Sequence, residues 1–407
     1  MAISTRLLGL GASAAIIFAA CGPTGGGAST APSTGGGTAT QAPTATQAGG
    51  SGAPASQGTA TKDYKACVAF DTGGLGDKGF NDLAKKGLDD AKAAGYETAS
   101  AEAQGSTDYE RNIQSLIDAG CKTIVTVGFL QSSATAKATL ANPTIAFAQV
   151  DATWNSAGDD FTPGTADDPP PGVPANFTGL DYQVDQAAML AGYLAGGWSK
   201  TGKIGTFGGL AFPGVTRFMD GLYAGIQYYN QQKGTNVELF GWDGSLEDPT
   251  TTGTFVGGTG GTDTWNDTSK GEDFAKTFIN QGADIVHPVA GETGNGAIKA
   301  MSEKNLWAIG VDTDQWISIG PPTNKAILTS AQKAIDVSVL DVINKNATGD
   351  LGGEDYSGTL DNGGVLLSPF HDYEAEIPAE LKSEIDALKT KIADGSITVC
   401  SFLGRGC

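Results

Sequence analysis

The stretch that decides the fold is Asp71-Thr-Gly-Gly-Leu-Gly-Asp77-Lys-Gly-Phe80-Asn81-Asp82. It follows a short apolar run at 66–70 and precedes a helical pattern of apolar residues at 83–91. A strand that ends in a glycine-rich turn and continues as a helix is the first half of a βαβ unit. Ligands of open α/β sheets lie just outside the carboxyl ends of such strands. The loop therefore predicts a binding site with carboxylates, an amide and an aromatic ring, which are supplied by Asp71, Asp77, Asn81 and Phe80.

Two other interpretations of this loop are a nucleotide phosphate loop and a plain helix cap. The chain contains no G-x-x-x-x-G-K-[ST], although Gly74, Gly76 and Gly79 do have the spacing of G-x-G-x-x-G. Two aspartates beside the turn would repel a polyphosphate. The phosphate loop is therefore disfavoured, whereas a solvated turn in which Asn81 or Asp82 caps the helix remains open.

The rest of the chain alternates short β-branched runs with amphipathic helical segments. This alternation is typical of parallel sheets covered by helices on both faces, so the predicted fold class is α/β. The roughly 345 residues after the N-terminal region are enough for two lobes, each with its own core. We expect strands near 66–70, 123–127, 144–150, 203–207, 237–241, 284–289, 307–311 and 326–330, and helices near 81–94, 109–118, 184–194, 215–231, 274–281, 294–302, 334–344 and 379–393.

Two segments interrupt the alternation. Residues 155–175 are acidic and proline-rich, and residues 244–270 are rich in glycine, threonine and aspartate. Both compositions predict surface excursions rather than domains, and the sequence does not say what these insertions do.

Polar groups and glycines follow several other predicted strands. Asp151 and Asp312 each come directly after a predicted strand. Phe212 and Gly291 lie in glycine-containing turns that follow two others. Each feature alone has a structural explanation as a turn or helix cap. Together with the 71–82 loop they predict one ligand site at the carboxyl ends of parallel strands.

The sequence of the N-terminal region predicts a secretion signal followed by a flexible linker. Residues 1–20 carry one arginine and then an apolar run too short for a stable membrane span. The run ends in Phe18-Ala-Ala-Cys21, which resembles the lipobox of bacterial lipoproteins and implies a lipid anchor on Cys21. The alternative is an ordinary cleaved signal near Cys21. Residues 21–61 lack charge, and such a polar, glycine-rich segment predicts a flexible linker spanning roughly 30 to 40 Å.

The net charge and the cysteine content limit which partners, metal sites and disulfides the chain can have. The net charge of −20 argues against nucleic acid and anionic lipid surfaces. No C-x-x-C occurs, and the chain's two histidines are isolated, so we expect no metal site and no cofactor. With Cys21 assigned to lipid, the remaining cysteines allow three pairings. The short separation favours Cys400 with Cys407, whereas Cys67 and Cys121 either pair or are simply buried.

At this point the motifs resemble a known family, the basic membrane protein family. Its members are the purine-nucleoside-receptor-like substrate-binding lipoproteins of ABC transporters. The resemblance covers nearly everything from Lys65 to Leu367 and departs from the family at the two insertions, at Gly79 and at Glu292. Beyond the 71–81 motif it rests on these segments in order: 176–179, 186–194, 203–209, 217–221, 282–286, 309–315 and 329–333.

The resemblance implies a type I periplasmic binding protein fold. Two doubly wound parallel-sheet lobes would be joined by a hinge of three crossings, near Asp181, just after Asp312 and near Thr348. The first lobe would comprise 62–180 and 313–348, and the second 181–312 and 349–407.

The resemblance also implies site chemistry. Phe80 would stack on a purine, with Phe212 as a second ring, and Asn81 and Asp151 would bond the base edge. Gly291 would let backbone approach the ribose.

Asp312 and Lys333 would bond the sugar hydroxyls, because a carboxylate accepts from adjacent hydroxyls. The alternative for these two residues is an ion pair without ligand contact. Asp71 and Asp77 would either contact ligand or hold the loop in shape.

The resulting prediction is a monomeric, lipid-anchored receptor on the extracytoplasmic side of the cell membrane. It would bind a nucleoside, most simply a purine nucleoside, and deliver it to ABC permease subunits. No catalytic residues are expected, because the chain has no G-x-S-x-G and no Ser-His-Asp order. The alternatives are a receptor of the same fold for a sugar or another small polar ligand, a signalling lipoprotein, and a nucleoside hydrolase.

Overall fold

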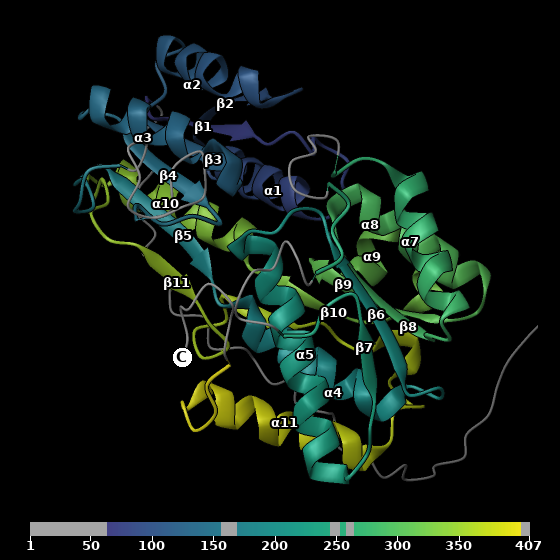
Figure 1. The fold of residues 1–407 in the computed structure, drawn as a ribbon. Coiled ribbons are helices and arrows are strands. Elements are labelled where there is room, and N and C mark those ends of the chain that lie inside the picture. The colour runs from purple at the N-terminus through teal and green to yellow at the C-terminus, as the bar shows by residue number, and fades with distance from the viewer. Residues whose placement is uncertain (1–62, 156–168, 245–252, 258–263, 400–407) are drawn as a thin grey trace, which may run out of the picture. The chain divides into compact units, whose positions relative to one another are not determined.

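The computed structural model describes residues 63–155, 169–244, 253–257 and 264–399. Within these ranges the strands form two six-stranded sheets (Figure 1). None of the helices in these ranges is both long and apolar enough to cross a membrane. The predicted signal at 1–20, Cys21 and the linker 21–61 lie outside the described residues.

The first sheet has the strand order β11-β5-β4-β3-β1-β2, and all its pairs are parallel. Helices α1 and α10 cover one face, and α2 and α3 cover the other (Figure 1). The elements are β1 (Lys65–Phe70), α1 (Phe80–Ala93), β2 (Glu97–Glu102), α2 (Tyr109–Asp118), β3 (Thr123–Val127), α3 (Ser132–Ala141), β4 (Ala146–Val150), β5 (Phe177–Tyr182), α10 (Ile335–Ala347) and β11 (Tyr356–Gly358).

The second sheet has the order β12-β10-β9-β8-β6-β7, and only β12 runs antiparallel to its neighbour. Helices α4, α5 and α11 pack together on one side, and α7 and α8 pack on the other (Figure 1). The elements are α4 (Val184–Trp198), β6 (Lys203–Gly208), α5 (Pro213–Lys233), β7 (Glu238–Phe240), α7 (Thr268–Asn280), β8 (Ile285–Val289), α8 (Gly291–Glu303), β9 (Trp307–Asp312), α9 (Gln315–Ile319), β10 (Ile327–Lys333), β12 (Val365–Leu367) and α11 (Ala379–Ala393).

The predicted α/β class with two parallel-sheet lobes is confirmed. The sequence pattern missed β2, β11 and β12, which lie at sheet edges, and β5, which lies between β11 and β4. β2 has the sequence Glu-Thr-Ala-Ser-Ala-Glu and pairs on one side only, so it carries no buried apolar run that would reveal it.

The first crossing between the sheets lies near Asp181, as expected, but the other two differ from the expected positions. The chain leaves the first sheet after Tyr182, returns after Lys333 and leaves again after Gly358. β10 therefore lies in the second sheet, although the expected first lobe included 313–348, and β11 lies in the first sheet, although 349–407 was assigned to the second. Strand periodicity says nothing about which sheet a strand joins, because that choice is made by tertiary pairing.

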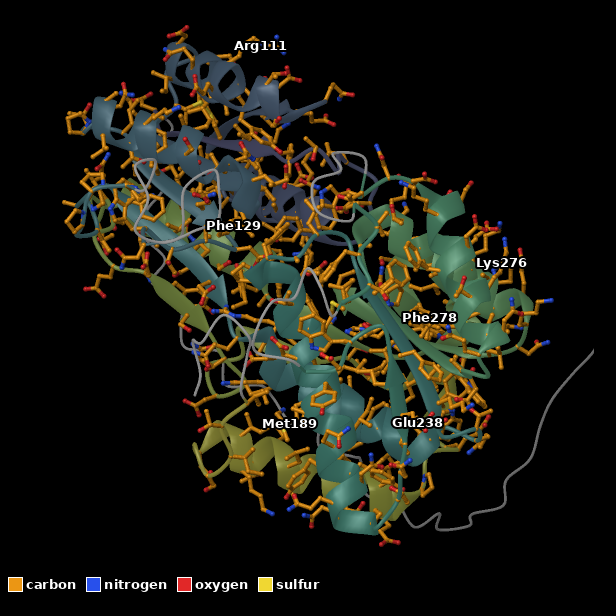
Figure 2. All side chains as sticks on the ribbon, viewed as in Figure 1. Arg111, Phe129, Met189, Glu238, Lys276 and Phe278 are labelled. Carbon is orange, nitrogen blue, oxygen red and sulfur yellow. A yellow bond between two sulfur atoms is a disulfide. The ribbon has the colours of Figure 1, made fainter. Side chains whose placement is uncertain are left out.

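The second lobe is held together by close packing of α4 on α5. A Cβ added to Gly225 would lie 2.1 Å from the carbonyl oxygen of Met189, and one on Gly192 would lie 2.2 Å from that of Leu222. The absence of side chains at these positions lets the two helix backbones touch. Figure 2 labels Met189 on this helix pair.

Part of the second insertion is core rather than surface. Phe255 forms a parallel bridge with Gly208, and both Phe255 and Val256 are buried. The indole of Trp242 packs edge-on against Phe255 and donates to Asp220. The prediction that 244–270 is only a surface excursion was therefore wrong for these residues, because isolated apolar residues in a glycine-rich segment give no periodic signal. Residues 156–168 of the first insertion lie outside the described residues.

A disulfide joins Cys67 on β1 to Cys121, which lies two residues before the start of β3. The other two candidates, Cys400 and Cys407, lie outside the described residues. The bond closes a loop with a sequence separation of 54 between neighbouring strands.

We expect a Cys67→Ala/Cys121→Ala double variant to lose about 2 to 4 kcal/mol of unfolding free energy, because the bond restricts the unfolded chain. Urea unfolding under non-reducing conditions measures the loss. Peptide mapping of the unreduced wild type should recover the Cys67–Cys121 crosslink. Two free thiols at these positions, with a variant as stable as the wild type, would contradict the prediction.

Candidate functional site: a cavity at the carboxyl ends of both sheets

A cavity lies where the carboxyl ends of strands from both sheets meet. Its wall includes all nine predicted ligand residues: Asp71, Asp77, Phe80, Asn81, Asp151, Phe212, Gly291, Asp312 and Lys333. The expectation that these residues converge at one cavity is therefore confirmed, whereas their contacts with a ligand remain predictions.

Asp77 holds the 71–82 loop in shape. Its carboxylate accepts hydrogen bonds from the backbone N–H groups of Gly79, Asn81 and Asp82, at 2.9, 2.7 and 3.2 Å. These groups lie at the start of α1, which otherwise has unpaired N–H donors. Burial raises the pKa of Asp77, although these hydrogen bonds act in the opposite direction. The carboxylate thus shapes the loop, which is one of the two roles expected for it.

The carboxylate of Asp71 is also fixed by hydrogen bonds. The hydroxyl of Tyr109 and the N–H of Thr72 donate to its carboxylate. Burial raises the pKa of Asp71. The neighbouring loop accommodates it through Gly128, where an added Cβ would lie 2.2 Å from the Asp71 carboxylate.

Asn81 links these two aspartates. Its Oδ1 accepts from the N–H of Asp71 at 3.0 Å, and its Nδ2 donates to Asp77 at 3.2 Å. An amide nitrogen has a second hydrogen, so Asn81 retains one donor for a ligand. If Asn81 contacts a base edge as expected, it can do so only by donating the second hydrogen of Nδ2.

Lys333, at the end of β10, lies between two aspartates from different sheets. Its Nζ is 2.6 Å from Oδ2 of Asp151 and 3.5 Å from Oδ1 of Asp312. Both aspartates adopt left-handed backbone angles, with φ of 59° and 63°. The ammonium group is buried, since only 3% of Lys333 is exposed. Lys333 therefore forms the ion pair with Asp312 that the alternative interpretation expected, and a shorter one with Asp151.

One carboxylate oxygen of this cluster accepts no hydrogen bond. Oδ1 of Asp312 is buried and makes no hydrogen bond. Burial raises the pKa of Asp312 to about 6, against the opposing effect of Lys333. Burial acts to lower the pKa of Lys333, but the two carboxylates outweigh it and raise the value. Because buried acceptors are normally satisfied, this oxygen is the best-placed group in the cluster to accept from a ligand hydroxyl.

Aromatic rings form much of the remaining wall. Phe129, which follows β3, and Phe212, which follows β6, stack with centroids 5.5 Å apart and planes 13° apart. Figure 2 labels Phe129 beside the teal strands of the first sheet. Phe212 also meets the ring of Trp265 edge-on at 5.9 Å. Phe80 lies below Lys333, whose Nζ is 5.4 Å from the ring centroid.

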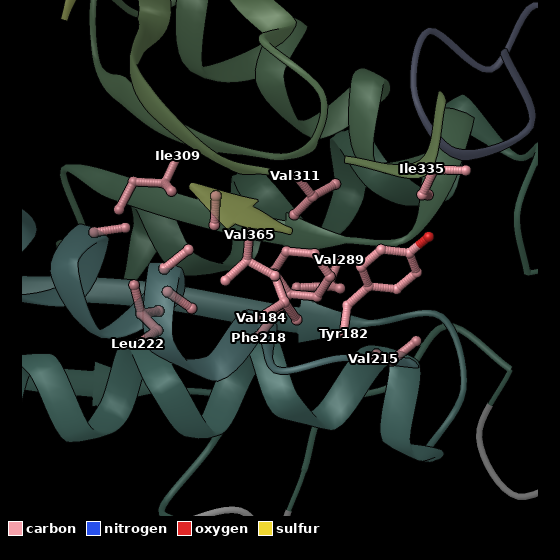
Figure 3. Packing of buried hydrophobic residues seen from close by; sticks show 14 of the residues in the cluster. Tyr182, Val184, Val215, Phe218, Leu222, Val289, Ile309, Val311, Ile335 and Val365 are labelled. Atoms are coloured by element: carbon pink, nitrogen blue, oxygen red, sulfur yellow. The ribbon is translucent and has the colours of Figure 1, made fainter. Parts of the chain in front are cut away.

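The apolar side of the cavity continues into the core. Phe218, Val215, Val289 and Val311 line the cavity and belong to the largest buried cluster (Figure 3). Lys333 lies 4.9 Å above the Phe218 ring. The position of this wall is thus fixed by core packing rather than by mobile loops.

Sequence reasoning missed three aromatic wall residues, Phe129, Phe218 and Trp265. Phe129 follows Gly128 at the end of a predicted strand, so the strand-end rule was sufficient to find it. Phe218 lies inside α5, where it reads as an ordinary core residue. Trp265 lies in the 244–270 insertion, where no periodic pattern of apolar residues indicated a buried or cavity-lining position.

Hydrogen bonds join loops of the two sheets beside the cavity. Asn295 on α8 donates to the carbonyl oxygen of Asp77 at 2.9 Å, and Ser318 on α9 donates to that of Lys78 at 2.7 Å. Gln315 in turn donates to the amide oxygen of Asn295 at 3.0 Å. The described residues contain no group of three histidine, cysteine or acidic side chains arranged for a metal ion.

The comparisons with known proteins agree on one family. The sequence matches the family described as ABC transporter substrate-binding protein PnrA-like over residues 65–252 and 259–401. The ABC transporter nucleoside-binding protein BmpA of Lactococcus lactis subsp. cremoris (strain MG1363) is 28% identical over 370 residues, covering 86% of this chain and 92% of that protein. Basic membrane protein A2 of Borrelia garinii subsp. bavariensis is 30% identical over 333 residues, covering 80% of this chain and 86% of its own length.

Solved structures agree with this assignment. An ABC transporter solute-binding protein from Aeropyrum pernix K1 superposes with a TM-score of 0.67 at 25% identity, covering 82% of this chain and 92% of its own. A solute-binding protein from Conexibacter woesei DSM 14684 shares the fold, with a TM-score of 0.60 at 20% identity over 83% of this chain and 99% of its own. The family resemblance inferred from the motifs is therefore confirmed, and the chain belongs to the PnrA-like, or basic membrane protein, family of ABC transporter substrate-binding proteins.

Proposed function

We propose that this protein binds a nucleoside in the cavity between its two sheets. The observation that carries the proposal is the pairing of an aromatic wall with the buried carboxylate of Asp312. Its Oδ1 accepts no hydrogen bond and lies 3.5 Å from the Lys333 ammonium group. Aromatic rings stack on any nucleobase, and a carboxylate accepts hydrogen bonds from sugar hydroxyls. Phe80 and Phe212 are the proposed stacking rings. The name of the Lactococcus relative supports the same ligand class.

The charge of the wall supports a nucleoside rather than a nucleotide. Among the residues that the structure describes, the cavity is lined by four aspartates and by one basic side chain, that of Lys333. Lys333 is already paired with Asp151, so no cation is left for a phosphate. A neutral ligand that carries donor groups fits these walls, and purine nucleosides are the proposed class.

The family is a substrate-binding family of ABC transporters, so the protein works with permease subunits and is not an enzyme. We propose a lipid anchor on Cys21 that holds a monomer on the extracytoplasmic side of the membrane. The Cys67–Cys121 disulfide supports that location, because disulfides persist mainly in oxidising compartments. Mass spectrometry of the mature N-terminus tests the anchor, and light scattering tests the monomer. An unmodified Cys21 or a dimer would contradict the respective proposal.

Isothermal titration calorimetry with adenosine, guanosine, inosine, uridine, ribose and adenosine monophosphate tests the ligand. We expect binding of at least one purine nucleoside, with ribose and the nucleotide much weaker. Phe80→Ala is expected to weaken that binding roughly 10- to 100-fold, because it removes a stacking surface. Phe370→Ala removes a similarly half-buried ring that does not line the cavity and serves as the control. Binding of ribose but of no nucleoside would favour a sugar receptor instead.

A further inference from the structure

We propose that Trp265 contacts the bound ligand directly and limits the size of ligand that the cavity accepts. This inference rests on the proposed nucleoside-binding function. It assigns a specificity role to a residue of the glycine-rich insertion, which would otherwise be read as surface.

The backbone around Trp265 is fixed in place. Its carbonyl oxygen accepts from the N–H of Thr293, in the first turn of α8, at 3.0 Å. Two residues later, the N–H of Asp267 donates to the hydroxyl of Thr293 at 2.9 Å, and the Asp267 side chain caps α7 by accepting from Lys270. Trp265 is thereby held between the starts of two helices, so its ring has a defined position.

Two strand-end loops leave room for Trp265. A Cβ added to Gly209, after β6, would lie 2.3 Å from the indole ring, which leaves no space for a side chain there. One on Gly291, after β8, would lie 3.2 Å from the Trp265 carbonyl oxygen, which is a tight contact. Gly291 was expected to let backbone approach a ribose, and in this structure its nearest neighbour is Trp265. These two glycines therefore accommodate the tryptophan.

The ring forms one side of a corner in the cavity wall. Its plane makes an angle of 61° with that of Phe212. A flat ligand that stacks on one of these rings must present its edge or a substituent to the other. Trp265 is also the sole tryptophan among the residues that line the cavity, whereas the other five of the chain lie elsewhere. Its fluorescence is consequently a specific reporter of ligand contact.

The test measures affinity and tryptophan fluorescence of the purified full chain and its variants. The probe is whichever of adenosine, guanosine or inosine binds the wild type most tightly. We expect this nucleoside to change the fluorescence of the wild type and of the control Trp307→Phe, since Trp307 lies at the opposite end of β9 from Asp312. The change is expected to disappear in Trp265→Phe, measured at a nucleoside concentration that saturates this variant by calorimetry. Trp265→Ala should bind roughly 10- to 100-fold more weakly.

The size limit is tested with two enlarged adenosines, N6-benzyladenosine and 5′-O-benzyladenosine. We expect Trp265→Ala to gain affinity for at least one of them relative to adenosine, at least tenfold over wild type. An unchanged fluorescence response in Trp265→Phe, or no relative gain for either enlarged ligand, would overturn the inference while leaving the nucleoside receptor intact. A wild type that binds no nucleoside would overturn the proposed function and this inference with it.

Discussion

Replacing Lys333 by methionine is expected to lower the unfolding free energy at pH 8 by about 3 to 5 kcal/mol. The variant keeps the length of the side chain and removes its charge. Asp151 and Asp312 then remain buried beside each other without the ammonium group that lies between them. An isolated buried charge is far more costly than a paired one, and the two carboxylates also repel each other.

The loss should depend on pH in a defined direction. Burial already raises the pKa of both carboxyls in the wild type, and removal of Lys333 raises these values further. A carboxyl group with a raised pKa in the folded state loses stability as the pH increases through that value. The deficit of Lys333→Met should therefore be large at pH 8 and smaller at pH 5, where protonation neutralises the carboxyls.

Urea unfolding at both pH values measures this difference. Lys85→Met is the control, because Lys85 forms an exposed helical ion pair with Asp89, and such pairs contribute little. A Lys333→Met variant as stable as the wild type at pH 8 would show that the cluster does not hold the two sheets' strand ends together.

The strand-end loops explain why much of this site was predictable. In a parallel sheet every strand delivers its following residue to the same edge, so Asp151 had to lie near the 71–82 loop. Asp312 lies at the corresponding edge of the other sheet, and its approach to that loop depends on how the two sheets meet. The alternation of apolar runs was sufficient to place those strands. Which residues gather at the site thus depends on local pattern and a general rule of topology.

The pairing within the site was not predictable, for a different physical reason. Asp77 and Asn81 have several partners within reach, and backbone geometry at the start of α1 selects among them. Lys333 was expected beside Asp312, but it lies closer to Asp151 because the strands of two sheets meet there. The contribution of Trp265 depends on space left by glycines far apart in sequence. Such choices are made by tertiary packing, to which a single sequence gives no direct access.

Asp185 provides the clearest pH-dependent prediction outside the cavity. It lies in the first turn of α4, is buried, and its Oδ1 has no hydrogen-bond partner. Burial raises its pKa to about 7, Arg217 acts in the opposite direction, and Asp220 adds to the rise. The unfolded chain releases this proton near the ordinary value of 3.8. The folded state consequently loses stability as the pH rises from about 4 to about 7.

Asp185→Asn removes this titration and should therefore raise the unfolding free energy at pH 8, by at most about 4 kcal/mol for a shift of this size. The gain should shrink at pH 5, where the wild-type carboxyl is mostly protonated in the folded state. Asp89→Asn, on the exposed face of α1, should show no such pH dependence. Urea unfolding of the three proteins at pH 5 and pH 8 decides the matter. An Asp185→Asn variant with the same stability difference at both values would mean that Asp185 is ionised in the folded protein throughout, with Arg217 outweighing its burial.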